Sequence, residues 1–392
     1  MFRPDSDPKW RSHALALAFG TFAVGTDAFV IAGILPQIGQ SLEVSVQAAG
    51  QLVSVFSLAY AISAPLLGTA TADWQRRNAL VFALTLFAVG NAITAAVPGY
   101  AWVLFSRVIA AAGAGLFTAS ASATAATLAG TSNRGAAIAR VMLGLTMSLV
   151  FGAPLGTAMA SAIGWRGTMW FVTALGIAAG ILIHLRLPRS AEAQVSTVSE
   201  RLAQLRNRSV MWDLLRSVVA FTGVYIPYTY ISVVYREAVD AKPGFLGSAL
   251  LVFGVCGTCG NLLAGKLSDR VGPTAVIIAG LLGFTLVCIL VPVATSSPFM
   301  SLVAVAASGM FAFSLTTPQQ ALLLSRSAGG HLSVLTALYQ SSVYIAVALS
   351  GVLGALIITA FGRGALTYIA ALITASAALM SWRQSEAKPV DS

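Results

Sequence analysis

The stretches TATADWQRR (residues 69–77) and GKLSDRVGPT (residues 265–274) decide the architecture, because they carry the same motif twice. Each holds an aspartate followed by an arginine: Asp73 with Arg77, and Asp269 with Arg270. The two aspartates lie half the length of the 392-residue chain apart. A repeat at this distance indicates two related halves.

Outward from these stretches, both halves consist of apolar segments long enough to cross the ~30 Å core of a membrane as helices. Gly, Ala, Ser and Thr occur throughout them, as close helix packing in lipid requires. The segments are residues 13–36, 47–70, 78–97, 101–128, 137–162 and 168–187 in the first half, and 212–235, 245–267, 273–294, 297–323, 332–360 and 364–382 in the second. The sequence therefore predicts an all-α membrane protein with twelve transmembrane helices.

The composition excludes other classes of protein. Hydrophobic residues make up 57% of the chain and charged residues 9%, against about 25% charged in an ordinary soluble domain. The mean hydropathy is +0.83. Disordered chains and disulfide scaffolds do not have this composition. The three cysteines lie in apolar segments and form no zinc motif, so we interpret them as helix-packing residues.

The positive charge is interpreted as a topology signal. The net charge is +10, but the basic residues are scattered between apolar segments, and no nucleic-acid motif is present. Most basic residues fall on the side that carries both termini, which predicts cytoplasmic termini. Residues 188–210 are the one long polar connection, and they divide the chain into halves at 1–187 and 211–392. This connection could form a short amphipathic helix or a solvated linker.

Two charged residues fall well inside apolar segments. Asp27 lies in AFGTFAVGTDAFVIAGILP and Arg107 in WVLFSRVIAAAGAG. At 1.5 Å per residue, Asp27 is about 13 Å and Arg107 about 9 Å from the outer end of its helix, so the two could meet. A buried charge is costly and marks a functional site by default. Asp27 could exchange a proton while Arg107 adjusts the affinity of its carboxylate for that proton. Alternatively, the two residues could form a permanent structural ion pair.

Other polar residues and breaks within the segments are weaker signals. Tyr228 or Tyr230 could face a substrate cavity, because tyrosine combines an apolar face with one hydroxyl. Asn261, Gln319, Gln320 and Gln340 could line the same path or bond between helices. Gly152, Pro154 and Gly156 predict a kinked, closely packed fifth helix.

The repeated motif suggests a gate. Asp73, Arg77, Gly265, Asp269 and Arg270 lie at the expected cytoplasmic helix ends, where their contacts could form in one state and break in another. A simple excess of positive charge on that side is the alternative.

No catalytic or nucleotide-binding motif occurs in the sequence. A Walker A pattern is absent, and His13, His184 and His331 are far apart, so we expect neither an enzyme nor a metal or other cofactor. Transport would then be driven by an ion gradient. A single carboxylate within a membrane span can bind and release a proton, which favours a proton gradient as the driving force.

Taken together, residues 13–383 resemble the major facilitator superfamily and, within it, the twelve-helix drug:proton antiporter family 1. GKLSDRVGPT matches the loop motif of that family, and the first copy departs from it at Thr69, Trp74 and Arg76. Arg107 with Gly113 and Gly115 resembles the helix-four motif, and GAPLG followed by GWR resembles the antiporter motif of helix five. YTYIS and FGVCGTCGNLLAGKLSDR are similar to the sugar-efflux, purine-efflux and chloramphenicol-resistance branch.

The resemblance implies two six-helix halves with pseudo-two-fold symmetry and a cavity between them. It implies multidrug-type export of a small organic molecule in exchange for protons, by alternating access, from a bacterial inner membrane. Asp27 would couple protons and Arg107 would be its partner. The partners would be substrate, protons and lipid, with no nucleic acid, and we expect a monomer. Export of a sugar, nucleoside or secondary metabolite, proton symport, a receptor and a membrane enzyme are the alternatives.

Overall fold

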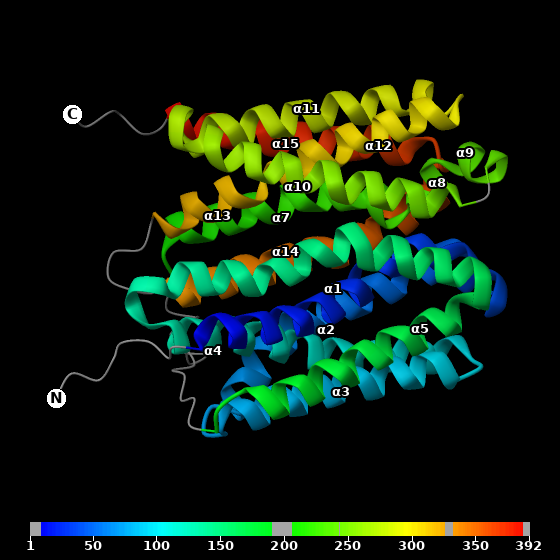
Figure 1. The fold of residues 1–392 in the computed structure, drawn as a ribbon. Helices are drawn as coiled ribbons and strands as arrows, with labels where there is room; N and C mark the ends of the chain where they lie inside the picture. Colours follow the sequence, from blue (N-terminus) through cyan, green and yellow to red (C-terminus); the bar gives the residue numbers. More distant parts are fainter. Residues whose placement is uncertain (1–8, 190–205, 243, 326–331, 387–392) are drawn as a thin grey trace. The chain divides into compact units, whose positions relative to one another are not determined.

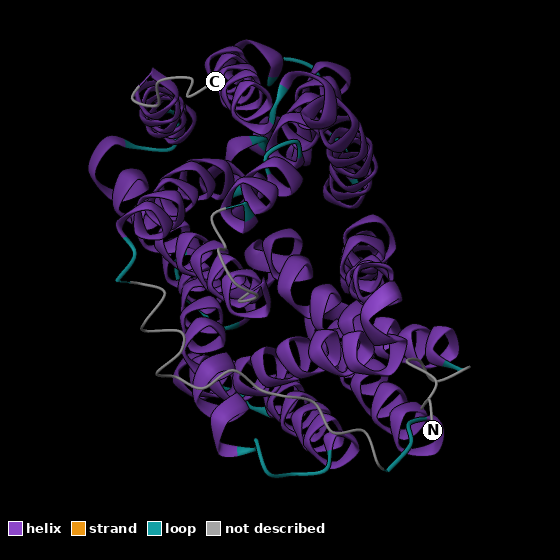
Figure 2. Cartoon of the chain, turned by 90° about the vertical axis from the view of Figure 1, so that its left-hand side faces the viewer, coloured by secondary structure: helices purple, strands orange, loops and turns teal. Residues whose placement is uncertain are grey.

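The computed structural model describes residues 9–189, 206–242, 244–325 and 332–386, so most of the expected connection at 188–210 lies outside the described residues. All regular secondary structure in the described part is helical (Figure 2). The chain forms two compact units: the first contains the described residues of 1–44 and 55–200, and the second those of 45–54 and 201–392. The predicted halves, 1–187 and 211–392, stay a prediction.

The first unit is built from long helices (Figure 1). They are α1 (Trp10–Ser41), α2 (Val46–Ala70), α3 (Arg76–Ala96), α4 (Tyr100–Met147), the short π-helical turn η1 (Ser148–Gly152) and α5 (Ala153–Arg186). The first residues of α2, up to Ser54, group with the second unit. Within the first unit α1 packs on α4 and α5, and α3 also packs on α4 and α5.

The second unit contains more interruptions (Figure 1). Its helices are α7 (Arg208–Thr229), α8 (Ile231–Val234), α9 (Arg236–Ala241), α10 (Phe245–Val271), α11 (Pro273–Ala294), α12 (Pro298–Phe313), α13 (Thr316–Leu324), α14 (Leu332–Phe361) and α15 (Ala365–Glu386). The predicted seventh segment, 212–235, is divided after Thr229. Pro227 has no N–H to donate to the carbonyl of the preceding turn, which weakens the helix there.

Eleven helical stretches of the described chain are long and apolar enough to cross a membrane. The longest, Asn133–Arg186, has 54 residues and would measure about 80 Å if straight, more than twice the hydrocarbon core. It bends at Gly164, whose φ is 79° and ψ is 161°. Counted as two crossings, it brings the total to twelve, and the predicted twelve-helix fold is confirmed.

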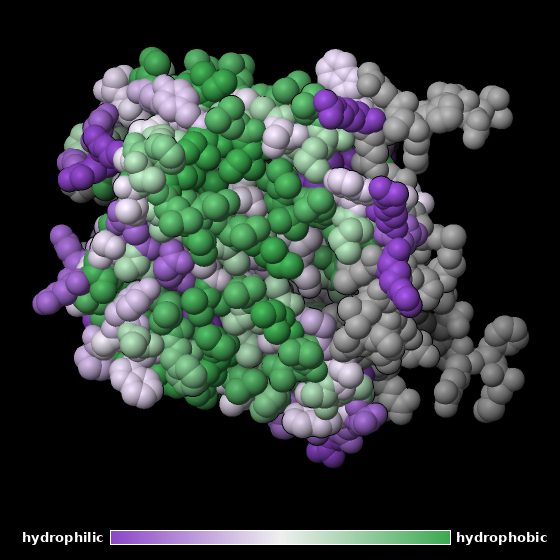
Figure 3. All heavy atoms as spheres, turned by 180° about the vertical axis from the view of Figure 1, so that it is seen from behind, coloured by the Kyte–Doolittle hydropathy of each residue, from purple (hydrophilic) through white to green (hydrophobic). Residues whose placement is uncertain are grey.

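Large apolar side chains lie on the outside of the helices, as in a protein surrounded by lipid. Leu185, Val293 and Phe361 are 73%, 75% and 73% exposed. Hydrophobic residues cover most of the face in Figure 3, and hydrophilic residues gather toward its two ends. A soluble monomer rarely exposes a continuous apolar surface of this kind.

Small residues allow α1 to approach the fifth crossing closely. Gly144, Ser148, Gly152 and Gly156 follow one another at every fourth position through α4, η1 and α5. A side chain added at Gly144 would meet the Ala18 carbonyl, one at Gly152 would meet the Thr26 hydroxyl, and one at Gly156 would lie 2.6 Å from Val30. Ser148 in turn faces Gly25. The helices are therefore in contact along the whole length of this row.

Gly164 is required by the backbone at the bend rather than by space. No atom lies within 4 Å of the position that a Cβ would take, but the φ of 79° with a ψ of 161° is almost restricted to glycine. We expect Gly164→Ala to lower the free energy of unfolding by about 1–3 kcal/mol, measured by chemical unfolding in detergent. Gly180→Ala, in the regular part of α5, is the control and should be neutral or stabilising. Equal effects of the two substitutions would contradict a conformational cause.

Candidate proton site in the first unit

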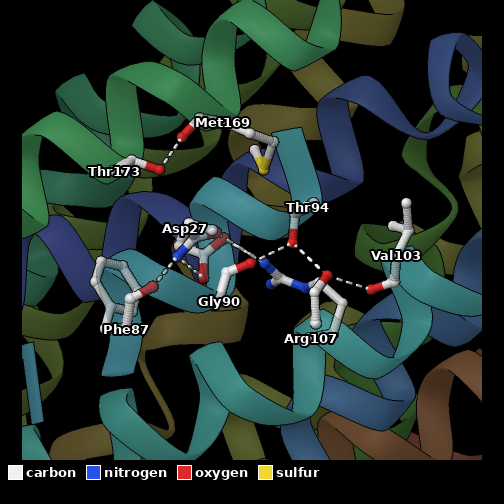
Figure 4. Close-up of polar contacts among 10 residues, drawn as sticks. Asp27, Phe87, Gly90, Thr94, Val103, Arg107, Met169 and Thr173 are labelled. Carbon is white, nitrogen blue, oxygen red and sulfur yellow. Dashed lines mark hydrogen bonds and ion pairs between the residues drawn. The ribbon is translucent and has the colours of Figure 1, made fainter. Parts of the chain in front are cut away.

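Asp27 of α1 and Arg107 of α4 form an ion pair in the interior of the first unit. Arg107 Nη1 lies 2.7 Å from Asp27 Oδ1. Figure 4 shows the two side chains pointing toward one another. Asp27 is 0% exposed and Arg107 1%. The structure thus brings together the two charges that the sequence singled out, and it shows direct contact between them.

Asn91 of α3 is the third member of the site, and nothing in the sequence singled it out. Its Nδ2 donates to Asp27 Oδ2 at 3.3 Å, and its Oδ1 accepts from Arg107 Nη1 at 3.3 Å. Asn91 is fully buried. An amide can serve both ions because it is donor and acceptor at once. Three helices therefore share one buried polar cluster.

The guanidinium of Arg107 is only partly satisfied by these contacts. Nη1 serves both Asp27 and Asn91, whereas the buried Nε has no hydrogen-bond partner among the described residues. The ring of Phe56 lies 4.3 Å from the guanidinium carbon, which is within range of a cation–π interaction. Arg107 is thus held by a carboxylate, an amide and an aromatic face rather than by a two-pronged salt bridge.

Close contact between α3 and α4 positions Asn91 beside Arg107. A Cβ at Gly90 would meet the backbone of Ala110, and one at Gly113 would meet the backbone of Ala83 and Phe87. Only glycine permits backbones to approach so closely. Near this crossing Thr94 and Ser106 join the same two helices through their hydroxyl groups, 2.7 Å apart. Local packing therefore sets the geometry of the ion pair.

The motif expected to mark an antiporter lies next to this site. Gly152 ends η1, and Pro154 is the second residue of α5, which continues directly from η1, so its missing N–H removes one backbone hydrogen bond of the continuous helix. Gly152 faces Thr26, the residue before Asp27. Gly156 lies one turn further and faces Val30. A π-helical turn, Ser148–Gly152, lies at this position, and the predicted kink stays a prediction.

The predicted gating residues lie in or beside two connections between helices. Asp73 is exposed in the turn between α2 and α3, and Arg77 Nη1 donates to the His184 carbonyl at 3.4 Å. In the second copy Gly265 is half-buried near the end of α10, while Asp269 and Arg270 are exposed there. Their role in gating stays a prediction.

The two tyrosines proposed for a substrate cavity have different surroundings. Tyr228 lines a cavity of about 20 Å³ inside the second unit, with Phe253 and Cys288 among its other walls. This is room for about one water molecule. Tyr230 is 0% exposed, and its hydroxyl donates to the Gly351 carbonyl at 2.7 Å. In this structure, the Tyr230 hydroxyl is therefore used within the protein.

Asn261 and Gln340, two of the amides predicted to line a substrate cavity, also lie in the second unit. Asn261 Oδ1 accepts a hydrogen bond of 2.8 Å from the Thr317 hydroxyl, which links α10 to α13. Gln340 is half-buried in α14. Their contact with a substrate stays a prediction.

A second buried ion pair was not expected from the sequence. In α7, Arg216 Nη2 lies 3.2 Å from Asp213 Oδ1, and both side chains are almost fully buried. Because Asp213 is close to the start of its helix, its sequence position alone did not distinguish it from residues at a membrane surface. No group of three or more metal-ligating side chains occurs in the described parts of the chain.

Known proteins resemble this chain over most of its length. The Major Facilitator Superfamily model matches residues 17–239 and 217–391. The uncharacterized MFS-type transporter YbcL of Bacillus subtilis is 31% identical over 93% of this chain and 92% of its own. The chloramphenicol efflux pump Rv0191 of Mycobacterium tuberculosis is 29% identical over 95% and 90%. The crystal structure of a D-xylose-proton symporter, 18% identical, matches with a TM-score of 0.78 over 95% of this chain and 97% of its own.

The matches agree with the fold described above. The symporter shares the fold, and the family model spans nearly all twelve crossings. The protein is therefore a multi-pass membrane transporter. The chain belongs to the major facilitator superfamily.

Proposed function

We propose that this transporter exports a small, drug-like or amphipathic organic molecule in exchange for protons. The proposal rests on one observation above all: a fully buried carboxylate, Asp27, whose partner Arg107 touches it through a single nitrogen. A permanent structural pair of this kind is expected to be two-pronged, with its other donors satisfied. The Arg107 Nε has no hydrogen-bond partner among the described residues, and the Asn91 amide contacts both ions. Both features favour an ion pair that breaks and forms again during transport.

The exchange step is a proton transfer at Asp27. A proton from the external medium adds to a carboxylate oxygen, and the neutral acid no longer attracts Arg107 as an ion. Arg107 then retains its hydrogen bond to Asn91 Oδ1 and its cation–π contact with the Phe56 ring. Release of the proton to the cytoplasm restores the ion pair. The two arrangements are the alternatives that alternating access requires.

Relatives favour export as the direction of transport. Proteins similar to this chain in Mycobacterium tuberculosis and Streptomyces lividans are named as a chloramphenicol efflux pump and a chloramphenicol resistance protein. The helix-five motif with Gly152, Pro154 and Gly156 supports antiport. We place the protein in a bacterial inner membrane as a monomer, with both termini in the cytoplasm because the basic residues lie on that side.

The experiment compares Asp27→Asn with Asp213→Asn, the matched control at the other buried acid. In inverted vesicles from an efflux-deficient bacterium, we expect wild type and the Asp213 variant to accumulate chloramphenicol when the vesicle interior is acidic. The Asp27 variant should fall to the level of vesicles without the protein, at equal expression. The same host should lose resistance with that variant only. Accumulation by the Asp27 variant at the wild-type rate would contradict the proposed coupling.

A further inference from the structure

The tenth crossing carries an interruption in its hydrogen bonding. α12 ends at Phe313 and α13 begins at Thr316. Pro318 has no N–H, so it cannot donate to the Ser314 carbonyl as a regular helix would. The hydroxyl of Tyr339, in α14, donates to the Thr316 carbonyl at 3.1 Å. Ser314 and Leu315 keep helical backbone angles, so the crossing continues through a locally weakened turn. Discontinuous helices form the binding sites of several transporter folds.

Gln319 follows this interruption, and its side-chain amide is buried without a hydrogen bond to any described residue. The side chain is 2% exposed, and neither Nε2 nor Oε1 has a partner among the described residues. An amide offers two donors and an acceptor with two lone pairs. Buried polar groups are nearly always paired, so a wholly unpaired amide requires an explanation. The amide of Asn261 on the adjoining α10 is, by contrast, occupied by Thr317.

The charges of the described membrane spans restrict what such a site could bind. The described spans contain three carboxylates. Asp27 is paired with Arg107 and Asp213 with Arg216, whereas Asp269 is exposed near the end of α10. A cation that enters a low-dielectric interior needs a negative partner there. In these spans, no buried carboxylate lacks an arginine. An uncharged ligand needs only donors and acceptors, which Gln319 supplies.

We propose that Gln319 is a substrate-binding residue and that the substrate is an uncharged organic molecule with hydroxyl or amide groups. This inference rests on the proposed transport function and narrows its substrate class. The Nε2 group of Gln319 donates to a substrate oxygen, and Oε1 accepts from a substrate O–H or N–H. Organic cations are excluded as the main substrates.

The binding test uses purified protein in detergent and isothermal titration calorimetry. The probes are chloramphenicol, uridine and isopropyl thiogalactoside, which are uncharged, and the cation tetraphenylphosphonium. We expect at least one uncharged probe to bind wild type and Gln320→Met equally, and to bind Gln319→Met about tenfold more weakly. The cation should bind more weakly than that probe. A preference for the cation, or unchanged affinity in the Gln319 variant, would overturn the proposal. Equilibrium binding needs no proton gradient, so failure of proton exchange would leave this result intact.

A stability measurement decides the matter if none of the four probes binds. Methionine has the length of glutamine and no unpaired amide, so Gln319→Met should raise the thermal midpoint of the ligand-free protein by about 2 °C or more. Gln320→Met, at the half-buried neighbouring position, should leave it unchanged. A lower midpoint for the Gln319 variant would show that its amide bonds helices together. That result would overturn the binding role.

Discussion

Arg107→Met is expected to lower the free energy of unfolding by about 3–5 kcal/mol, because it leaves the Asp27 carboxylate buried without its cation. The methionine fills most of the volume of the arginine stem, so the loss reports on charge rather than on a cavity. Asn91 can still donate to Asp27 Oδ2, but one neutral hydrogen bond at 3.3 Å cannot replace an ion pair at 2.7 Å. Chemical unfolding of the purified protein in detergent measures the effect.

The second substitution Asp27→Leu should restore most of this stability in the double variant, because it removes the charge that was left unpaired. Arg363→Met is the matched control. Arg363 pairs with Glu237 at 3.3 Å, but both side chains are about half exposed, so its loss should cost less than about 1 kcal/mol. If the Arg107 single variant were as stable as the Arg363 variant, the pair would not be buried as described.

Gly144→Ala should have a comparable effect on the contact between α1 and the fifth crossing. The new methyl group would meet the Ala18 carbonyl and the Thr21 hydroxyl. A backbone carbonyl cannot turn aside as a side chain can. The Thr21 hydroxyl also lies 2.6 Å from the Val141 carbonyl, to which it donates across the two helices. Overpacking combined with loss of this buried hydrogen bond should cost about 3–5 kcal/mol.

Gly135→Ala provides the control for Gly144→Ala within the same helix, α4. No atom lies within 4 Å of the position that its Cβ would take, and alanine is the better helix former. We expect this variant to be as stable as wild type or more so. Unfolding in detergent and the yield of monodisperse protein would measure both variants. A stable Gly144 variant would mean that the two helices are further apart than described.

The crossings were predictable because the thickness of the bilayer fixes both the length and the apolar character of each helix. The interruptions were not. A residue such as Pro227 or Pro318 leaves the hydropathy of its segment unchanged, and neighbouring helices decide whether the backbone continues through it. The break after Thr229 and the gap before Thr316 therefore appeared only in the structure.

The ion pair was predictable in part because charges in membrane spans are rare, which made Asp27 and Arg107 conspicuous. Asn91 is neutral, and nothing in its sequence context distinguishes it from the other amides of the chain. Its position depends on the close approach at Gly90 and Gly113, which is a property of packing. Gln319 was considered among several amides, and its full burial without a partner in the described structure separates it from Asn261.

The turn η1 keeps the row of small residues in rotational phase with α1. In an α-helix each residue advances about 100°, so a step of four residues overshoots a full turn by about 40°. Three such steps, from Gly144 to Gly156, would accumulate about 120° and carry the last glycine round the helix, away from its partner. A π-turn advances by less per residue, so a four-residue step within it falls short of a full turn and offsets this drift. One locally unwound turn thus acts as a phase correction, and it allows a simple four-residue period to follow a single neighbouring helix past the proton site.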